Sequence, residues 1–114
     1  MHLEPRILII GRNIVVVNIL VQELEKFDRN IMVAVDRPDI QRLLHLHNPD
    51  FIVVGNGLPE NERNELLVFL LNIKADLKIH LVDNKEKPSP YDLIDFTNKK
   101  AVEWKIERVL GKRY

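Results

Sequence analysis

Residues 49–59 read PDFIVVGNGLP, and this stretch decides the fold of the chain. Its centre, residues 51–54, is a short apolar run rich in β-branched side chains, with Pro49 before it and Gly55 after it. Such a run is typical of a strand that is buried on both faces of a parallel sheet. The stretch therefore predicts a central strand whose carboxyl end opens at Gly55.

Three more apolar runs have the same character and lie at residues 6–10, 31–35 and 79–82. Segments with apolar residues at helical spacing separate the four runs and lie at residues 14–27, 37–47 and 60–73. Strands that alternate with helices over short connections predict a parallel sheet covered by helices on both faces. The fold class expected is therefore α/β.

The first helical segment, residues 14–27, has an alternative interpretation. Leu20 and Leu24 recur at helical spacing, and Asn13 is a suitable N-cap. The β-branched residues 14–17 also fit a strand, and the preceding Gly-Arg-Asn also fits a turn. A hairpin therefore stays open at this point, although the length of the segment and its later polar face favour the helix.

The C-terminal part follows the alternating pattern less closely. After a polar, proline-punctuated loop at residues 84–90, the sequence predicts one helix from Pro90 to residue 96 and a second helix at residues 101–110. Only residues 98–101 are left for a fifth strand, so we expect that strand to be short or missing. The apolar stripe of the second helix consists of Val102, Ile106, Val109 and Leu110.

Composition limits the classes of function. The 114 residues suffice for one domain, 1–114, with one core. Lysine plus arginine equals aspartate plus glutamate at 17 each, so we expect neither nucleic acid nor a membrane surface as the main partner. The absence of cysteine excludes disulfides and thiol chemistry. No apolar run approaches the roughly 20 residues that span a bilayer, and the N-terminus lacks a signal-peptide pattern, so we expect a cytoplasmic protein.

With this order of elements, the chain resembles the receiver domain of bacterial response regulators. The most specific part of the resemblance is RPDIQRLLHLHNPDFIVVGNGLP at residues 37–59, followed by NELLVFLL at residues 64–71. The resemblance covers residues 6–83, and residues 84–114 only loosely. It implies a three-layer α/β/α, flavodoxin-like (CheY-like) fold whose parallel strands follow the order 2-1-3-4-5.

In the receiver family, two acidic residues end strand 1 and an aspartate ends strand 3. Together they bind Mg²⁺, and the aspartate of strand 3 is phosphorylated. Mg²⁺ requires hard oxygen ligands in near-octahedral geometry, and the phosphoryl acceptor must be a nucleophilic carboxylate. A threonine or serine ending strand 4 and a lysine ending strand 5 respond to the new charge. The resemblance therefore implies particular residue types at these strand ends.

This chain departs from the family at those positions. The acidic pair falls on Gly11-Arg12 or on Arg12-Asn13. The phosphoryl acceptor falls on Gly55, because Pro59 follows four residues later, as the proline of the family does. None of these residues is a carboxylate. Arg12 is a cation where the metal ion would sit, and two positive charges a few ångströms apart repel each other.

The threonine position falls on Asp83, and the lysine of the family has no secure match among Lys87, Lys99 and Lys100. One acidic residue does not restore the site, and an ion pair between Arg12 and Asp83 is a hypothesis for what replaces the metal. We therefore expect no Mg²⁺, no other cofactor, no aspartyl phosphate and no enzymatic activity. The degenerate pocket consists of Gly11, Arg12, Asn13, Gly55, Asn56 and Asp83.

The resemblance and its gaps imply a pseudo-receiver, a receiver domain without a phosphoryl acceptor. We expect it to act in two-component-type signalling as a protein–protein interaction or regulatory module, with a protein partner or as a homodimer. Four of the seven aromatic residues lie in the C-terminal part, and aromatic residues are enriched in interfaces. The candidate interaction surface is Tyr91, Phe96 and Trp104; the alternative is that they form a small aromatic core.

The main alternative function is a sensor of a small anion or nucleotide. The ligand would lie at the carboxyl ends of strands 1 and 3, where open α/β sheets bind ligands, and main-chain amides, arginine and asparagine suit an anion. The lining residues would be Gly11, Arg12, Asn13, Gly55 and Asn56. A dinucleotide-binding unit with Asp36 on the ribose is disfavoured, because the G-x-G-x-x-G motif is absent.

Other residues have structural interpretations. Gly55 and Gly57 are expected to give the loop a positive φ, which only glycine adopts freely. His45 and His47 are two residues apart on a predicted helix and make a poor metal pair. His80 alternates with apolar residues and fits an interior or edge position in a strand.

Overall fold

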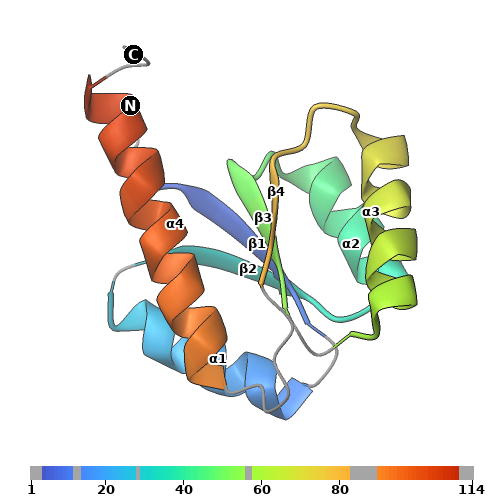
Figure 1. The fold of residues 1–114 in the computed structure, drawn as a ribbon, viewed down its shortest axis with the longest axis horizontal. Coiled ribbons are helices and arrows are strands. Elements are labelled where there is room, and N and C mark those ends of the chain that lie inside the picture. The colour runs from blue at the N-terminus through green and yellow to red at the C-terminus, as the bar shows by residue number, and fades with distance from the viewer. Residues whose placement is uncertain (1–3, 12–13, 28, 56–57, 83–89, 111–114) are drawn as a thin grey trace.

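The computed structural model describes residues 4–11, 14–27, 29–55, 58–82 and 90–110. Within these residues, strands and helices alternate along the chain (Figure 1). The elements are β1 (Arg6–Ile10), α1 (Ile14–Glu25), β2 (Asn30–Ala34), α2 (Arg37–Leu46), β3 (Phe51–Val54), α3 (Glu60–Ile73), β4 (Ile79–Leu81) and α4 (Pro90–Leu110). The segment after β1 is therefore a helix and not a strand of a hairpin.

The strands form a parallel sheet in the order β2-β1-β3-β4. β1 lies between β2 and β3, and β4 pairs with the other side of β3. Parallel neighbours require a crossover connection, and a helix supplies each one here. The order confirms the prediction of a flavodoxin-like sheet as far as its fourth strand.

Helices α1 and α4 cover one face of the sheet, and α2 and α3 cover the other (Figure 1). Successive strand residues alternate between these faces: Ile7 and Ile9 pack on the side of α1 and α4, and Leu8 and Ile10 on the side of α2 and α3. The residues of β3 are at most 1% exposed. Each such buried side chain contributes about 1.5–3 kcal/mol, so the central strands hold both layers of helices.

Helix α2 begins at Arg37, where the predicted segment begins, and ends at Leu46, one residue before the predicted end. Oδ1 of Asp36 accepts a hydrogen bond from the backbone N–H of Asp39 at 2.9 Å, which caps the helix. Pro38 lies in the first turn. At the other end, the N–H of His47 donates to the carbonyl of Leu43. The cap places the start of α2 directly after β2, at the carboxyl edge of the sheet.

The C-terminal region differs from the prediction, because residues 90–110 form one continuous helix. The prediction of two helices is therefore wrong. In the part of the chain that the structure describes, residues 98–101 lie inside α4 and no fifth strand pairs with β4. The physical reason is that residues 91–110 contain neither glycine nor proline, and lysine and alanine favour the helix.

The face of α4 that packs on the sheet also differs from the predicted one. Buried residues recur along one side of this helix and are Leu93, Ile94, Thr97, Ala101 and Trp104. The predicted stripe lies outward, with exposed fractions of 46% for Val102, 51% for Ile106, 75% for Val109 and 57% for Leu110. Because a continuous helix has one orientation about its axis, the docking of its first half decides which face of its second half is exposed.

A largely buried arginine fastens α4 to the amino-terminal side of the sheet. The Arg29 side chain is 8% exposed; its Nε donates to Oδ1 of Asn98 at 3.0 Å, and its Nη1 donates to Oε2 of Glu4 at 3.0 Å. Lys105 also forms an ion pair with Glu4. Burial alone would raise the pKa of Glu4, but the hydrogen bonds from Lys105 and Arg29 outweigh it and lower that pKa.

Among the helices of the described ranges, none is both long enough and apolar enough to cross a lipid bilayer. The longest, α4, has 21 residues, but charged side chains recur along it, including Asp95, Lys99 and Glu103.

Candidate functional site

The carboxyl edge of the sheet brings the ends of three strands side by side. The N–H of Gly55 donates to the carbonyl of Ile10 at 3.0 Å, and the N–H of Val82 donates to the carbonyl of Val54 at 3.0 Å. Gly11, which follows β1, therefore lies beside Gly55, which follows β3. This edge is the place at which open parallel α/β sheets bind ligands.

Four members of the degenerate pocket lie outside the described residues: Arg12, Asn13, Asn56 and Asp83. The ion pair between Arg12 and Asp83 therefore stays a prediction. The role of Gly57 in the loop, and Lys87 as a match for the lysine of the family, also concern residues outside the described ranges.

Gly55 is buried and has an ordinary backbone conformation. Its φ lies outside the left-handed region, so the expectation that it serves a positive φ is wrong. A Cβ atom at Gly55 would lie 3.6 Å from the carbonyl oxygen of Ile10 and 3.6 Å from Cδ2 of Leu93, which is normal van der Waals contact. The position thus admits a small side chain, and the backbone does not explain why none is present.

Gly11 differs from Gly55 in its steric surroundings. A Cβ atom at Gly11 would lie 2.9 Å from Cγ2 of Val17, closer than real Cβ contacts allow. Val17 belongs to α1 and is 3% exposed, so it has little room to move. The close approach of α1 to the end of β1 therefore requires a glycine at residue 11, and an aspartate there would disturb this contact.

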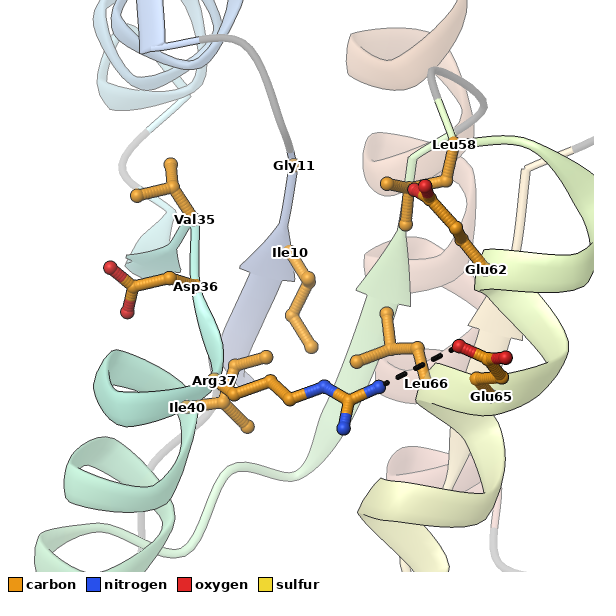
Figure 2. A pocket seen from close by; sticks show the side chains of 10 residues that line it. All are labelled: Ile10, Gly11, Val35, Asp36, Arg37, Ile40, Leu58, Glu62, Glu65 and Leu66. Carbon is orange, nitrogen blue, oxygen red and sulfur yellow. Dashed lines mark ion pairs between the residues drawn. The ribbon is translucent and has the colours of Figure 1, made fainter.

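A cleft of about 330 Å³ opens beside Gly11, between α2 and α3 (Figure 2). Arg37 of α2 reaches across it: its Nη2 lies 4.0 Å from Oε2 of Glu65, and its guanidinium lies 5.0 Å from the ring centre of Phe69. Both charged side chains are more than half exposed, so the ion pair is weak. The cleft is lined by Ile10, Gly11, Val35, Asp36, Arg37, Ile40, Leu58, Glu62, Glu65 and Leu66.

The residues at this edge do not fit a receiver-type magnesium site. The ends of β1 and β3 carry Gly11 and Gly55, which supply no carboxylate. Asp36, at the end of β2, uses one carboxylate oxygen to cap α2. No group of three or more histidine, aspartate or glutamate side chains within the described ranges is arranged to hold a metal ion. The donor set that Mg²⁺ needs is therefore missing from these residues.

Arg63 of α3 is a feature of this edge that the sequence analysis missed. It is 7% exposed, and its Nη2 donates to the carbonyl of Val82 at 2.8 Å. Its Nε is buried and has no hydrogen-bond partner among the described residues. A buried cation is costly unless it is paired. The spacing of residues in α3 could have predicted this burial. Arg63 precedes the buried Leu66 and Leu70 by three and seven residues, so it lies on the same face of the helix.

The three aromatic residues of the candidate interaction surface do not lie together on the exterior. Tyr91 is 63% exposed, whereas Trp104 is 8% exposed and belongs to the core between α4 and the sheet. Phe96 is half-buried and packs against the same core. Of the three, only Tyr91 offers an open aromatic surface.

His80 of β4 lies between two aromatic rings. Its ring centre is 5.4 Å from that of Phe51 and 6.4 Å from that of Phe96, both in edge-on geometry. Burial lowers the pKa of His80, and the positive charges of Lys100 and Lys78 lower it further. The strand position agrees with the sequence interpretation of this histidine.

One of three comparisons with known proteins found a match, and that match agrees with the fold described above. No protein-family model matches the chain, and no curated protein matches its sequence. Among solved structures, the chain is similar to the N-terminal domain of a response regulator receiver protein from Methanoculleus marisnigri JR1. The match has a TM-score of 0.57 and 18% sequence identity, and covers 94% of this chain and 97% of that chain. Strand order and structural similarity together give this chain the flavodoxin-like (CheY-like) fold of a receiver domain.

Proposed function

We propose that this chain, as one domain, is a non-phosphorylatable receiver-type module that acts in the cytoplasm by binding a protein. The receiver fold supports a two-component-type signalling module, although a fold alone does not determine a function. The observation that carries the proposal is Gly55. It occupies the end of β3, where the family places its phosphoryl acceptor, and it has no side chain.

Phosphorylation of a receiver requires a carboxylate oxygen that attacks phosphorus and a cation that neutralises the developing charge. Gly55 removes the first of these, and the absence of an acidic pair after β1 removes the second. Such a module conveys a signal by being bound and not by a covalent change. We therefore propose no enzymatic activity, no cofactor and no nucleic-acid partner.

Incubation with acetyl phosphate and Mg²⁺, followed by intact-mass measurement, tests this proposal. An active receiver domain treated in parallel should gain the mass of a phosphoryl group, and this chain should not. The Gly55→Asp variant, whose Cβ atom meets only normal contacts, should still gain little, because the acidic pair is missing. Acid-stable or hydroxylamine-sensitive phosphorylation of the unmodified chain would overturn the proposal.

The small-anion sensor is a second candidate, and Arg63 favours it. The guanidinium lies near the carboxyl end of β4, and its buried Nε has no acceptor in the described part of the chain. An anion at this edge would supply one. Thermal unfolding with increasing phosphate or a nucleoside triphosphate tests the idea. Saturable stabilisation that the Arg63→Met variant loses would support the sensor. An equal response of both proteins would exclude a role for Arg63.

A further inference from the structure

The side of β4 that faces away from β3 is an open strand edge. Within the described part of the chain, no strand pairs with that side. The carbonyl of Lys78 and the N–H of Val82 bond to β3, at 2.9 and 3.0 Å. Because the backbone groups of a strand alternate between its two sides, those of Ile79 and Leu81 point to the open side. We call these two residues, with their outward backbone groups, the β4 edge.

The β4 edge lacks the features that commonly protect such strands. Charged residues and prolines usually discourage pairing with another chain, and the strand Ile79–Leu81 contains neither a permanent charge nor a proline. Ile79 packs in the core beneath α2 and α3. Leu81 points to the same face because strand side chains alternate, and it is 36% exposed.

Helix α3 adds apolar surface beside the β4 edge. Arg63 marks the flank of α3 that faces β4, because it donates to the carbonyl of Val82. Leu67 and Leu71 follow Arg63 at intervals of four residues and continue this flank. Leu71 is 43% exposed. The open backbone groups and an apolar flank thus lie next to each other.

We propose that the β4 edge pairs with the β4 edge of a second copy of this chain, antiparallel, about a two-fold axis at His80. Ile79 then lies opposite Leu81 of the second copy, and the two residues exchange both of their backbone hydrogen bonds. Their side chains form apolar cross-strand pairs, the contacts that stabilise sheets. Leu67 and Leu71 of the two copies approach each other on the same face.

The charges on the other face favour a second copy over an unrelated strand. The flank of α4 beside β4 carries an ion pair between Lys78 and Glu107 at 3.5 Å and another between Lys100 and Glu103 at 3.2 Å. The two-fold axis reverses the second α4, so Lys100 faces Glu103 and Glu107 of the second copy. Opposite charges meet, and a net charge of zero adds no overall repulsion between copies.

The same geometry makes the association sensitive to pH. The two-fold axis places His80 next to His80 of the second copy, and burial favours the neutral form of each ring. Protonation of both rings would add like charges, so the dimer should weaken as the pH falls. The groups that face His80 from β3, β4 and α4 are Phe51, Lys78, Phe96, Lys100, Glu103 and Glu107.

This inference rests on the proposed function, since it names the partner of the binding module. Sedimentation velocity of the full chain over a wide concentration range tests it, at about pH 8 and about pH 5.5. We expect a reversible dimer that is weaker at the lower pH. The Leu81→Lys variant should dimerise roughly tenfold more weakly or not at all. The matched control, Val109→Lys on the exposed stripe of α4, should dimerise like the unmodified chain.

Amide hydrogen exchange gives a second readout that needs no variant. The amides of Ile79 and Leu81 should gain protection as the protein concentration rises, and the amide of Asn61, an exposed residue in the first turn of α3, should not. A chain that stays monomeric at every concentration would overturn the inference. A dimer that Val109→Lys dissociates and Leu81→Lys does not would assign the contact to α4 instead. Neither result depends on the phosphorylation assay, so the two proposals fail separately.

Discussion

The adjacent strands β1 and β3 are apolar on both faces and bury both, from Ile7 to Ile10 and from Phe51 to Val54. Helix α4 also carries apolar residues on two sides, but it buries only one of them. Ile9 and Val53 have no exposed surface, but Ile106 and Val109 of α4 are more than half exposed. A strand that is buried on both faces leaves no choice of orientation. A long helix with two apolar sides can pack with either side on the sheet, and its contacts with the sheet decide which side is buried. The pattern of apolar residues therefore predicts which strand residues are buried, but it does not predict which residues of α4 are buried.

The largest expected effect separates these two regions directly. Ile9→Ala removes a fully buried side chain and should lower the free energy of unfolding by about 3–4 kcal/mol. Val102→Ala, in the outward stripe of α4, should change it by less than about 0.5 kcal/mol. Urea denaturation of both variants checks this contrast. Similar losses from the two changes would mean that the outward stripe of α4 is packed in solution.

The attachment of α4 to the sheet should give the next largest effect. Arg29→Met removes the donor to Asn98 and one of the two cations at Glu4, and should cost roughly 1–3 kcal/mol, because the arginine is largely buried. Arg42→Met, at an exposed ion pair with Asp39, is the matched control and should cost less than about 1 kcal/mol. Thermal or urea unfolding measures both, and equal costs would show that Arg29 does not fasten α4.

The two glycines at the carboxyl edge should respond unequally to a methyl group. Gly11→Ala forces a contact with Val17 and should destabilise the protein by about 1–3 kcal/mol. Gly55→Ala meets only normal contacts and should stay within about 0.5 kcal/mol of the unmodified chain. Unfolding midpoints in urea decide the point. A larger loss at Gly55 than at Gly11 would contradict the steric account of this edge.

The smallest expected effect concerns His80 and pH. Folding lowers the pKa of this histidine below the ordinary value of 6.5, so the unfolded chain binds the proton more tightly. The stability due to neutral His80 is fully present above pH 6.5 and is lost as the pH falls from there through the folded pKa. His80→Phe should flatten this dependence, while His45→Asn on the exposed surface of α2 should keep it. Urea denaturation at low protein concentration, over this pH range, measures the difference.

Much of the fold is predictable from the sequence for a physical reason. Residues 51–54 and the other apolar runs can bury both of their faces only if helices cover both sides of the sheet. The helices between parallel strands form right-handed crossovers. Asp36 is of a residue type that caps helices, and Pro38 is of a type that fits a first turn; both lie where α2 begins. These local signals agree with one another on strands that alternate with helices around a parallel sheet. The strand order is implied by the resemblance to receiver domains, and the structure has that order for its four strands.

The orientation of α4, the burial of Arg63 and the steric surroundings of the two glycines depend on tertiary contacts, which local sequence patterns do not predict. The orientation of α4 depends on the packing of Leu93 and Trp104 on the sheet and on the contact between Arg29 and Asn98. Arg63 is buried because α3 lies beside the end of β4, not because of its residue type. At the candidate site, the sequence indicates that carboxylates are missing, but only the structure shows that a Cβ atom fits at Gly55 and does not fit at Gly11.

The most direct test of the central claim is the binding of beryllofluoride, which mimics a phosphoryl group on an aspartate, in the presence of Mg²⁺. Titration calorimetry, with fluorine NMR as a second readout, measures it on the full chain. A chain that keeps the receiver fold without the carboxylates at the ends of β1 and β3 should show no saturable binding. Stoichiometric, magnesium-dependent binding would contradict the account.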